Sequence, residues 1–128
     1  MAKRVPAAPQ AWPETAEFWA AANQKRLLLR RCRSTGRAYH YPRNHSPFNG
    51  SDNTEWIEAS GEGTIYSFSV MPRADPPYCI AYVTLAEGPT MLTNVLTDNF
   101  DRLHIGQSVR VSFEPSEGGQ LVPMFVPC

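Results

Sequence analysis

The sequence predicts a mainly β protein in which an N-terminal helix and a zinc-ribbon-like segment precede a five-stranded barrel of the OB type. Three observations support this prediction. Five short segments with alternating apolar residues follow one another in the second half, with no long helical pattern between them. Two turns that each end in glycine stand before those segments, as in a zinc ribbon. One short run of helix-forming residues precedes both turns.

The composition is that of a globular protein without a membrane span. Hydrophobic residues make up 42% of the 128 residues and charged residues 19%, and no run approaches the roughly 20 apolar residues that a span needs. The start, MAKRVPAAPQAWP, has no apolar stretch before a small-residue cleavage site, so we expect no secretory signal and a cytoplasmic location. The three cysteines are widely spaced, which predicts free thiols in a reducing compartment.

A short helix follows an irregular start. Residues 1–13 contain three prolines and no periodicity, which predicts a flexible arm. The run ETAEFWAAANQ is rich in helix formers, follows a proline and carries two glutamates near its beginning. Phe18 and Trp19, with Ala22 one turn after Phe18, give this helix an apolar face. We expect that face to pack on the body of the protein; docking onto another subunit is the alternative.

Residues 14–55 are predicted to combine this helix with a degenerate zinc ribbon. A ribbon needs C-x-x-C twice, because two thiolates three residues apart on a turn reach one tetrahedral ion, and the glycine after the second cysteine permits a left-handed backbone. The first turn here is CRSTG (32–36) and the second is SPFNG (46–50). Both glycines remain, whereas three of the four thiolate positions hold Thr35, Ser46 and Asn49. We therefore expect no zinc and no other cofactor bound stoichiometrically.

A residual metal site is the alternative, because thiolate and imidazole both bind zinc. Cys32, His40 and His45 would be its ligands, but their spacing fits no ordinary site, so we predict no metal ligands. A structural zinc contributes on the order of 10 kcal/mol to such small modules, so packing has to offset its loss. The candidates for this packing are Tyr39, Tyr41 and Phe48.

Residues 56–128 are predicted to form the OB-type barrel, since closing a sheet of short strands removes exposed edges. Its strands are predicted at 60–73, 78–88, 90–97, 109–114 and 121–127, and an earlier strand at 26–32. Alternation groups the apolar residues by face. The predicted groups are Tyr66 with Phe68 and Val70; Cys79 with Ala81, Val83 and Leu85; Leu92 with Leu96; and Val109 with Val111 and Phe113.

Several short motifs occur in a fixed order from residue 14 to residue 126. They are ETAEFW, RLLLRRC, Tyr41-Pro42-Arg43, Gly50-Ser51-Asp52, GTIYS, PPY, AYVTLAEG and a closing IGxxVxVxF. In these motifs the chain resembles the acyl-CoA-associated OB-fold proteins with a rubredoxin-like zinc ribbon, known as domain of unknown function thirty-five. The departure from the family is the ribbon, where only Cys32 survives, so zinc is not carried over.

The resemblance implies an accessory subunit rather than an enzyme. Members of that family bind thiolases, thiolase-like aldolases or acyltransferases, or hydratases, and help to assemble the active complex or to position an acyl-CoA. The residues agree, because the sequence has no nucleophile elbow, no H-E-x-x-H and no phosphate-cradling glycine loop. Cys79 lies mid-strand on an apolar face, where a free cysteine is usually a small buried hydrophobe. We therefore predict no catalytic residues.

Charge divides the chain into a basic and an acidic part. Residues 1–43 contain nine Lys and Arg against two Asp and Glu, whereas residues 44–128 contain three against ten. The candidate binding residues are Arg30, Arg31, Arg33, Arg37 and Arg43, which lie around the first turn and the strand after it. Arginine pairs phosphates with directional hydrogen bonds, so this stretch could contact coenzyme A or an acidic surface of the partner enzyme. The alternative is that the basic and acidic halves attract each other or that the basic face is merely solvated.

Two other functions stay open from the sequence. OB barrels often bind single-stranded nucleic acid through aromatic platforms, for which Tyr66, Phe68, Tyr78 and Tyr82 are candidates. The acidic balance of the barrel half opposes phosphate attraction and argues against nucleic acid as a partner. A third reading is an interaction domain unrelated to CoA, because a fold alone does not assign function.

Overall fold

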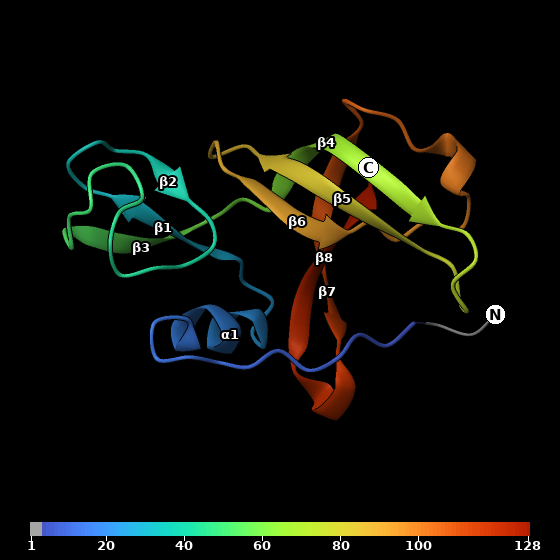
Figure 1. Ribbon diagram of the computed structural model, residues 1–128, viewed down its shortest axis with the longest axis horizontal. Coiled ribbons are helices and arrows are strands. Elements are labelled where there is room, and N and C mark those ends of the chain that lie inside the picture. The colour runs from blue at the N-terminus through green and yellow to red at the C-terminus, as the bar shows by residue number, and fades with distance from the viewer. Residues whose placement is uncertain (1–3) are drawn as a thin grey trace.

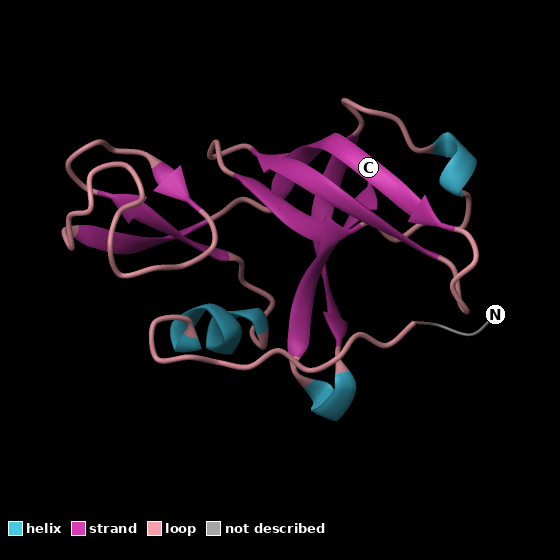
Figure 2. Ribbon diagram, viewed as in Figure 1, coloured by secondary structure: helices cyan, strands magenta, loops and turns pink. Residues whose placement is uncertain are grey.

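The computed structural model describes residues 4–128. Its elements are α1 (Ala16–Ala22), β1 (Leu28–Cys32), β2 (Ala38–Tyr39), β3 (Thr54–Glu58), β4 (Glu62–Met71), β5 (Tyr78–Leu85), β6 (Thr90–Asn94), β7 (Ser108–Pro115) and β8 (Leu121–Pro127), with short 3₁₀ turns at Phe100–Arg102 and Glu117–Gly119. Two sheets result, a three-stranded one of order β2-β1-β3 and a five-stranded one of order β6-β5-β4-β7-β8 (Figures 1 and 2). The predicted fold class, a helix and a ribbon followed by a five-stranded OB-type barrel, is confirmed.

The described part of the N-terminal arm runs beneath the barrel (Figure 1). Arg4 Nη1 donates to Asn94 Oδ1 at 3.2 Å, and the Arg4 guanidinium lies 4.2 Å from the ring centroid of Tyr78. The carbonyl of Pro6 accepts a hydrogen bond of 3.0 Å from the backbone N–H of Glu117. Residues 1–3 of the predicted arm lie outside the described residues. From residue 4 onward, the arm is therefore hydrogen-bonded to the barrel at two places.

Helix α1 packs against the body of the protein, as its apolar face predicts. Phe18, at 2% exposure, and Ala22 are buried. The helix lies beside the hairpin of β7 and β8 (Figure 1). Gln120 Nε2 donates to the carbonyl of Trp19 at 3.0 Å, and the N–H of Leu121 donates to Asn23 Oδ1 at 2.9 Å. Packing and hydrogen bonds thus hold the seven-residue helix, which is too short to be stable alone.

The ribbon sheet is antiparallel and pairs β1 with both of its neighbours. Arg30 lies opposite Tyr39 on β2 and Trp56 on β3. The β1–β3 pairing continues past the strand ends, where the N–H of Ala59 donates to the carbonyl of Leu27 at 2.8 Å. The sequence predicts the boundary between the ribbon and the barrel between residues 55 and 56. Strand β3, at Thr54–Glu58, spans this boundary.

A β-bulge corrects the predicted face of β4. The register to β5 shifts between Ile65 and Ser67, so Ile65 faces the core before the bulge, and Phe68 and Val70 pack against the core after it. Tyr66 falls within the bulge and is 66% exposed. The prediction that Tyr66 shares a face with Phe68 and Val70 is wrong, because an extra residue in a strand moves all later side chains to the other face.

On β6 the set predicted to share a face, Leu92 with Leu96, is not the set that is buried. Leu92 is 56% exposed, and the side chains that enter the core from this segment are Met91 and Val95. Both alternating sets of this segment contain apolar residues, so alternation alone does not fix which set is buried. On β5 the prediction is confirmed, since Cys79, Ala81, Val83 and Leu85 are all buried. On β7, Val109 is buried and the other two members of its set pack against the core.

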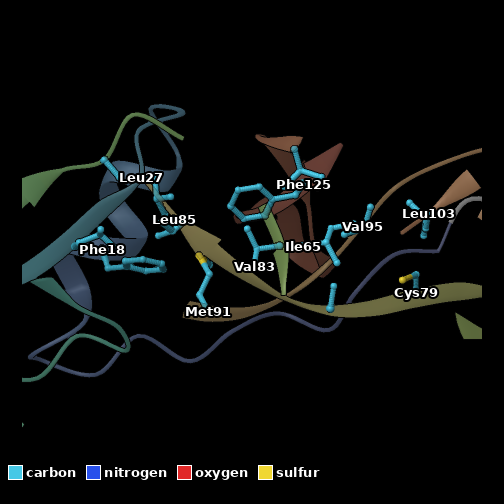
Figure 3. Close-up of a cluster of buried hydrophobic side chains, with 14 residues drawn as sticks. Phe18, Leu27, Ile65, Cys79, Val83, Leu85, Met91, Val95, Leu103 and Phe125 are labelled. Carbon is cyan, nitrogen blue, oxygen red and sulfur yellow. The ribbon is translucent and has the colours of Figure 1, made fainter. Parts of the chain in front are cut away.

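One hydrophobic core joins the helix, the ribbon and the barrel. Figure 3 shows Phe18 and Leu27 near Leu85 at one end of the cluster, and Cys79 and Leu103 at the other. The barrel closes where β6 and β8 meet in parallel, through the bridge of Val95 to Phe125. In the described residues, no helix is long and apolar enough to cross a membrane.

Candidate functional site

The two ribbon turns have matching backbones. In the first, the N–H of Gly36 donates to the carbonyl of Cys32 at 2.7 Å, and the N–H of Cys32 donates to the carbonyl of Arg37 at 2.9 Å. The second repeats this pattern, from Gly50 to Ser46 at 2.9 Å and from Ser46 to Ser51 at 2.8 Å. The two glycines have φ angles of 74° and 73°, in the left-handed region that disfavours other residues. Both turns therefore keep the shape of zinc knuckles.

Polar side chains meet where the four ligands of a ribbon would lie. Cys32 is fully buried, and its Sγ lies 3.3 Å from Ser34 Oγ and 3.9 Å from Asn49 Oδ1. Asn49 Nδ2 donates to Ser34 Oγ at 2.8 Å. Hydrogen bonds from Ser34, then from Ser46 and Thr35, lower the pKa of the Cys32 thiol to about 6. The two knuckles are thus joined by hydrogen bonds around one sulfur.

This donor set does not fit zinc. The four positions supply one thiol, two hydroxyls and one amide, whereas structural zinc takes four thiolate or imidazole ligands. No three His, Cys, Asp or Glu side chains are grouped for metal binding anywhere in residues 4–128. His40 packs instead between aromatic rings, 5.7 Å from Phe18 and 5.2 Å from Tyr41 between centroids, and His45 is exposed.

Aromatic packing supports the second knuckle from behind. Tyr39 is 5% exposed, and its ring meets the Phe48 ring edge-on at 6.1 Å between centroids. The Tyr39 hydroxyl donates to the carbonyl of Arg43 at 2.6 Å. Tyr41 accepts a hydrogen bond of 3.2 Å from Trp19 Nε1 and so ties the ribbon to α1. The three aromatic residues predicted to offset the loss of zinc therefore all make contacts within or next to the ribbon.

The candidate arginines divide into three groups. Arg31 and Arg33 share Glu55, with N–O distances of 2.6 and 3.6 Å. The hydrogen bond from Arg31, together with both positive charges, lowers the pKa of Glu55. Arg30 lies on the opposite face of the sheet, because consecutive strand residues point to opposite sides. It is hydrogen-bonded to Thr54 and stacks 4.8 Å from the centroid of the Trp56 ring.

Arg37 and Arg43 form the third group and are the more accessible pair. Both side chains are exposed. The Arg37 guanidinium lies 3.9 Å from the Phe48 ring centroid, and that of Arg43 lies 5.2 Å from the Tyr41 ring centroid. Arg43 also approaches Glu14 at 3.8 Å. Because Tyr39 contacts both Phe48 and the Arg43 backbone, the two arginines are linked through a shared aromatic cluster.

The aromatic platform expected on the barrel is only partly present. Tyr66 and Tyr82 are exposed at 66% and 48%. Phe68, by contrast, packs against the core, and Tyr78 is half-buried beneath the Arg4 guanidinium. Cys79 is 1% exposed, and burial raises the pKa of its thiol. The prediction that Cys79 is a small buried hydrophobic residue is confirmed.

A cavity that the sequence did not predict lies where the arm, helix, ribbon and barrel meet. Its volume is about 560 Å³, and Trp19, His40, Tyr82 and Leu92 are among its lining residues. His40 Nδ1 is buried without a hydrogen-bond partner, and burial, with a smaller effect of Arg43, lowers the pKa of His40 to about 4. These residues are far apart in the sequence and belong to different elements, so no local motif indicates the cavity.

Comparisons with known proteins identify two matching domains. Residues 19–54 match the family described as "ChsH2, rubredoxin-like zinc ribbon domain", and residues 56–114 match "ChsH2, C-terminal OB-fold domain". A protein of Thermomonospora curvata named "Probable enoyl-CoA hydratase alpha subunit" is 33% identical over 116 residues. The match takes in 86% of this chain, which spans only 36% of that relative.

Solved structures agree with this assignment. A chain of the "Ltp2-ChsH2(DUF35) aldolase" is 30% identical with a TM-score of 0.81, and the match covers 94% of this chain and 98% of that one. A DUF35 protein of unknown function from Sulfolobus solfataricus has the same fold, with a TM-score of 0.68 at 15% identity over 91% and 86% of the two chains. The chain therefore belongs to the ChsH2-like DUF35 family, in which a rubredoxin-like zinc ribbon domain precedes a C-terminal OB-fold domain.

Proposed function

We propose that the chain is a non-catalytic accessory subunit of an acyl-CoA enzyme. It would bind a thiolase-like enzyme, an aldolase or a hydratase, and help to assemble that enzyme or to position its acyl-CoA. The observation that carries this proposal is the end-to-end match to a chain of the Ltp2-ChsH2(DUF35) aldolase. The relative named as a hydratase alpha subunit supports the same class of partner.

The side chains described in the structure favour a non-catalytic role. Nucleophilic catalysis needs a nucleophile and a base within hydrogen-bond reach of each other. Within residues 4–128, no histidine side chain is hydrogen-bonded to a cysteine, a serine or a carboxylate. Cys32 and Cys79 are both closed off from solvent. The chemistry would therefore be performed by the partner.

Arg37 and Arg43 are the residues we propose for contact with coenzyme A or with an acidic surface of the partner. They are exposed, and aromatic rings hold both guanidinium groups, which limits the freedom they lose on binding. Arg31 and Arg33 fit this role less well, because Glu55 offsets part of their charge. The contact would position the ligand and carry no step of the reaction.

The test is reconstitution with an identified enzyme. The tagged chain is purified from its native host, co-purifying proteins are identified by mass spectrometry, and the best candidate is expressed with and without the chain. We expect a thiolase-like enzyme or hydratase whose solubility or turnover falls at least about tenfold without this subunit. Turnover of an acyl-CoA by the chain alone, after active contaminants are removed, would refute the non-catalytic role. Specific partners that handle no acyl-CoA would refute the assigned class.

A further inference from the structure

The barrel has an open seam between β6 and β8. These strands run parallel and meet at a single bridge, Val95 to Phe125, supported by a hydrogen bond of 2.8 Å from the N–H of Leu96 to the carbonyl of Phe125. Ahead of that bridge the two strands form no backbone ladder, and Thr93 Oγ1 donates a hydrogen bond of 3.3 Å across the gap to the carbonyl of Pro123. The cavity of about 560 Å³ lies there, lined by β6 residues 90–94 and β8 residues 122–124.

One edge of β6 faces this seam with unpaired backbone groups. The hydrogen bonds from Leu85 to Pro89 and from Val95 to Cys79 fix the alternation of the β5–β6 pairing. In an antiparallel pair, every second residue directs its N–H and C=O away from the neighbouring strand. On β6 those residues ahead of the bridge are Thr90, Leu92 and Asn94. The Asn94 carbonyl, next to the bridge, accepts a hydrogen bond of 3.4 Å from Thr93 Oγ1, whereas the backbone groups of Thr90 and Leu92 have no hydrogen-bond partner elsewhere in residues 4–128.

The walls of the seam are uncharged. They come from Pro6, Ala7 and Pro9 of the arm, from Phe18 and Trp19 on α1, from His40 and Tyr41, and from strands β5, β6 and β8, and no Lys, Arg, Asp or Glu is among them. Tyr82 and Leu92 stand at the rim and are exposed at 48% and 56%. An uncharged, largely apolar wall disfavours a charged occupant, because desolvating a charge there would go uncompensated.

We propose that this seam binds an extended, uncharged apolar segment of a partner protein, which adds a strand beside β6. Two features together select this occupant. The outward N–H and C=O of Thr90 and Leu92 can hydrogen-bond to the backbone of another segment, whereas an acyl chain offers no such groups. The wall selects apolar side chains at alternate positions of that segment. The chain's own arm is hydrogen-bonded beside the seam through Arg4 and Pro6, so the arm of a second copy would first have to displace it.

The test uses the full chain and does not depend on which enzyme is the partner. A displayed library of linear peptides is panned on the immobilised protein, and enriched peptides are titrated into the ¹⁵N-labelled chain. We expect enriched sequences that are uncharged and apolar at every second position, and that slow hydrogen exchange of the Leu92 amide at least about tenfold. No enrichment, or peptides that protect only amides outside β6, would overturn the proposal.

Proline substitution on two edge strands provides the matched control. Leu92→Pro removes an outward N–H, which an edge strand tolerates, together with the leucine side chain, and should weaken peptide binding at least about tenfold. Glu58→Pro removes an outward N–H from the edge strand β3 of the other sheet and should leave binding unchanged. Leu92→Ala separates the side chain from the amide and should weaken binding less than Leu92→Pro.

Two further outcomes would assign the seam to another occupant. Protection of the Leu92 amide that rises with protein concentration in the absence of peptide would show that a second copy fills the seam. Competition of octanoyl-CoA with the peptide would assign it to an acyl chain. If Leu92→Pro does not fold, the exchange of the Leu92 amide in the unmodified chain decides the question.

Discussion

Asn49 Nδ2, in the second knuckle, donates a hydrogen bond of 2.8 Å to Ser34 Oγ in the first. Ser34 Oγ in turn lies 3.3 Å from the buried Sγ of Cys32. Three polar side chains thus connect the knuckles at the place where a zinc ribbon holds its metal. Each hydrogen bond contributes about 1 kcal/mol net, against on the order of 10 kcal/mol for a structural zinc. Packing such as that of Tyr39 on Phe48 has to supply most of the difference.

The first prediction concerns zinc. Because three ligand positions hold Thr35, Ser46 and Asn49, the purified chain should contain far less than one zinc per molecule, and EDTA should not lower its Tm. The matched variant replaces all three by cysteine. Since both knuckle backbones are intact, it should bind about one zinc and unfold at a higher temperature when loaded. Elemental analysis and melting curves with and without EDTA check both. Stoichiometric zinc in the unmodified chain would contradict the prediction.

The second prediction concerns the connection between the knuckles. Asn49→Ala removes the bond to Ser34 and the bonds that Asn49 Oδ1 accepts from the N–H of Ser51 and, at 3.9 Å, from Cys32 Sγ. We expect the free energy of unfolding to fall by about 1–2 kcal/mol. Asn53→Ala is the control, because that side chain makes no hydrogen bond in the described structure. Urea denaturation of both variants measures the difference, and equal stability of the two would show that the connection contributes nothing.

The sequence predicted the strands of the barrel well, because most of them bury one alternating set of residues. Strand β8 was predicted at its observed bounds, and β7 to within one residue at each end. The errors have local causes. At Tyr66, β4 contains one residue more than the paired part of β5, and no local sequence pattern indicates this bulge. On β6 the side chains of Met91 and Leu92 are similarly apolar, so tertiary contacts decide which of them is buried.

The candidate site was less predictable than the fold. The glycines and the missing thiolates identify the knuckles from the sequence alone, because turn geometry is local. The grouping of the arginines depends on the pairing of strands that are distant in the sequence. Arg31 and Arg33 both reach Glu55 because β1 pairs with β3 in the observed register. The cavity beside β6 depends on the positions of four separate parts of the chain. The sequence therefore shows which residues are basic, but not which of them lie close together in the structure.

The third prediction concerns pH. Burial lowers the pKa of His40 to about 4 from an ordinary 6.5, so between these values the unfolded chain binds a proton that the folded chain does not. The free energy of unfolding should therefore fall as the pH drops from about 6.5 to about 4, by about 3 kcal/mol in total. Denaturation at pH 7 and pH 4.5 measures this loss. His40→Phe, which keeps an aromatic ring between Phe18 and Tyr41, should remove most of it. An unchanged pH dependence in that variant would show that other groups cause it.

The last prediction tests the arginine pair. Arg37→Ala with Arg43→Ala should leave the fold intact, because both side chains are exposed and the ion pair of Arg43 with Glu14 is solvated. It should weaken either coenzyme A binding or complex formation by about tenfold or more, as expected when charge-assisted hydrogen bonds are lost. Calorimetry at moderate salt measures both affinities. Arg73→Ala with Arg102→Ala is the control, since it removes the same charge from exposed barrel positions. Equal losses in the two variants would indicate a general charge effect, whereas unchanged binding in both would mean that the ribbon arginines are only a solvated face.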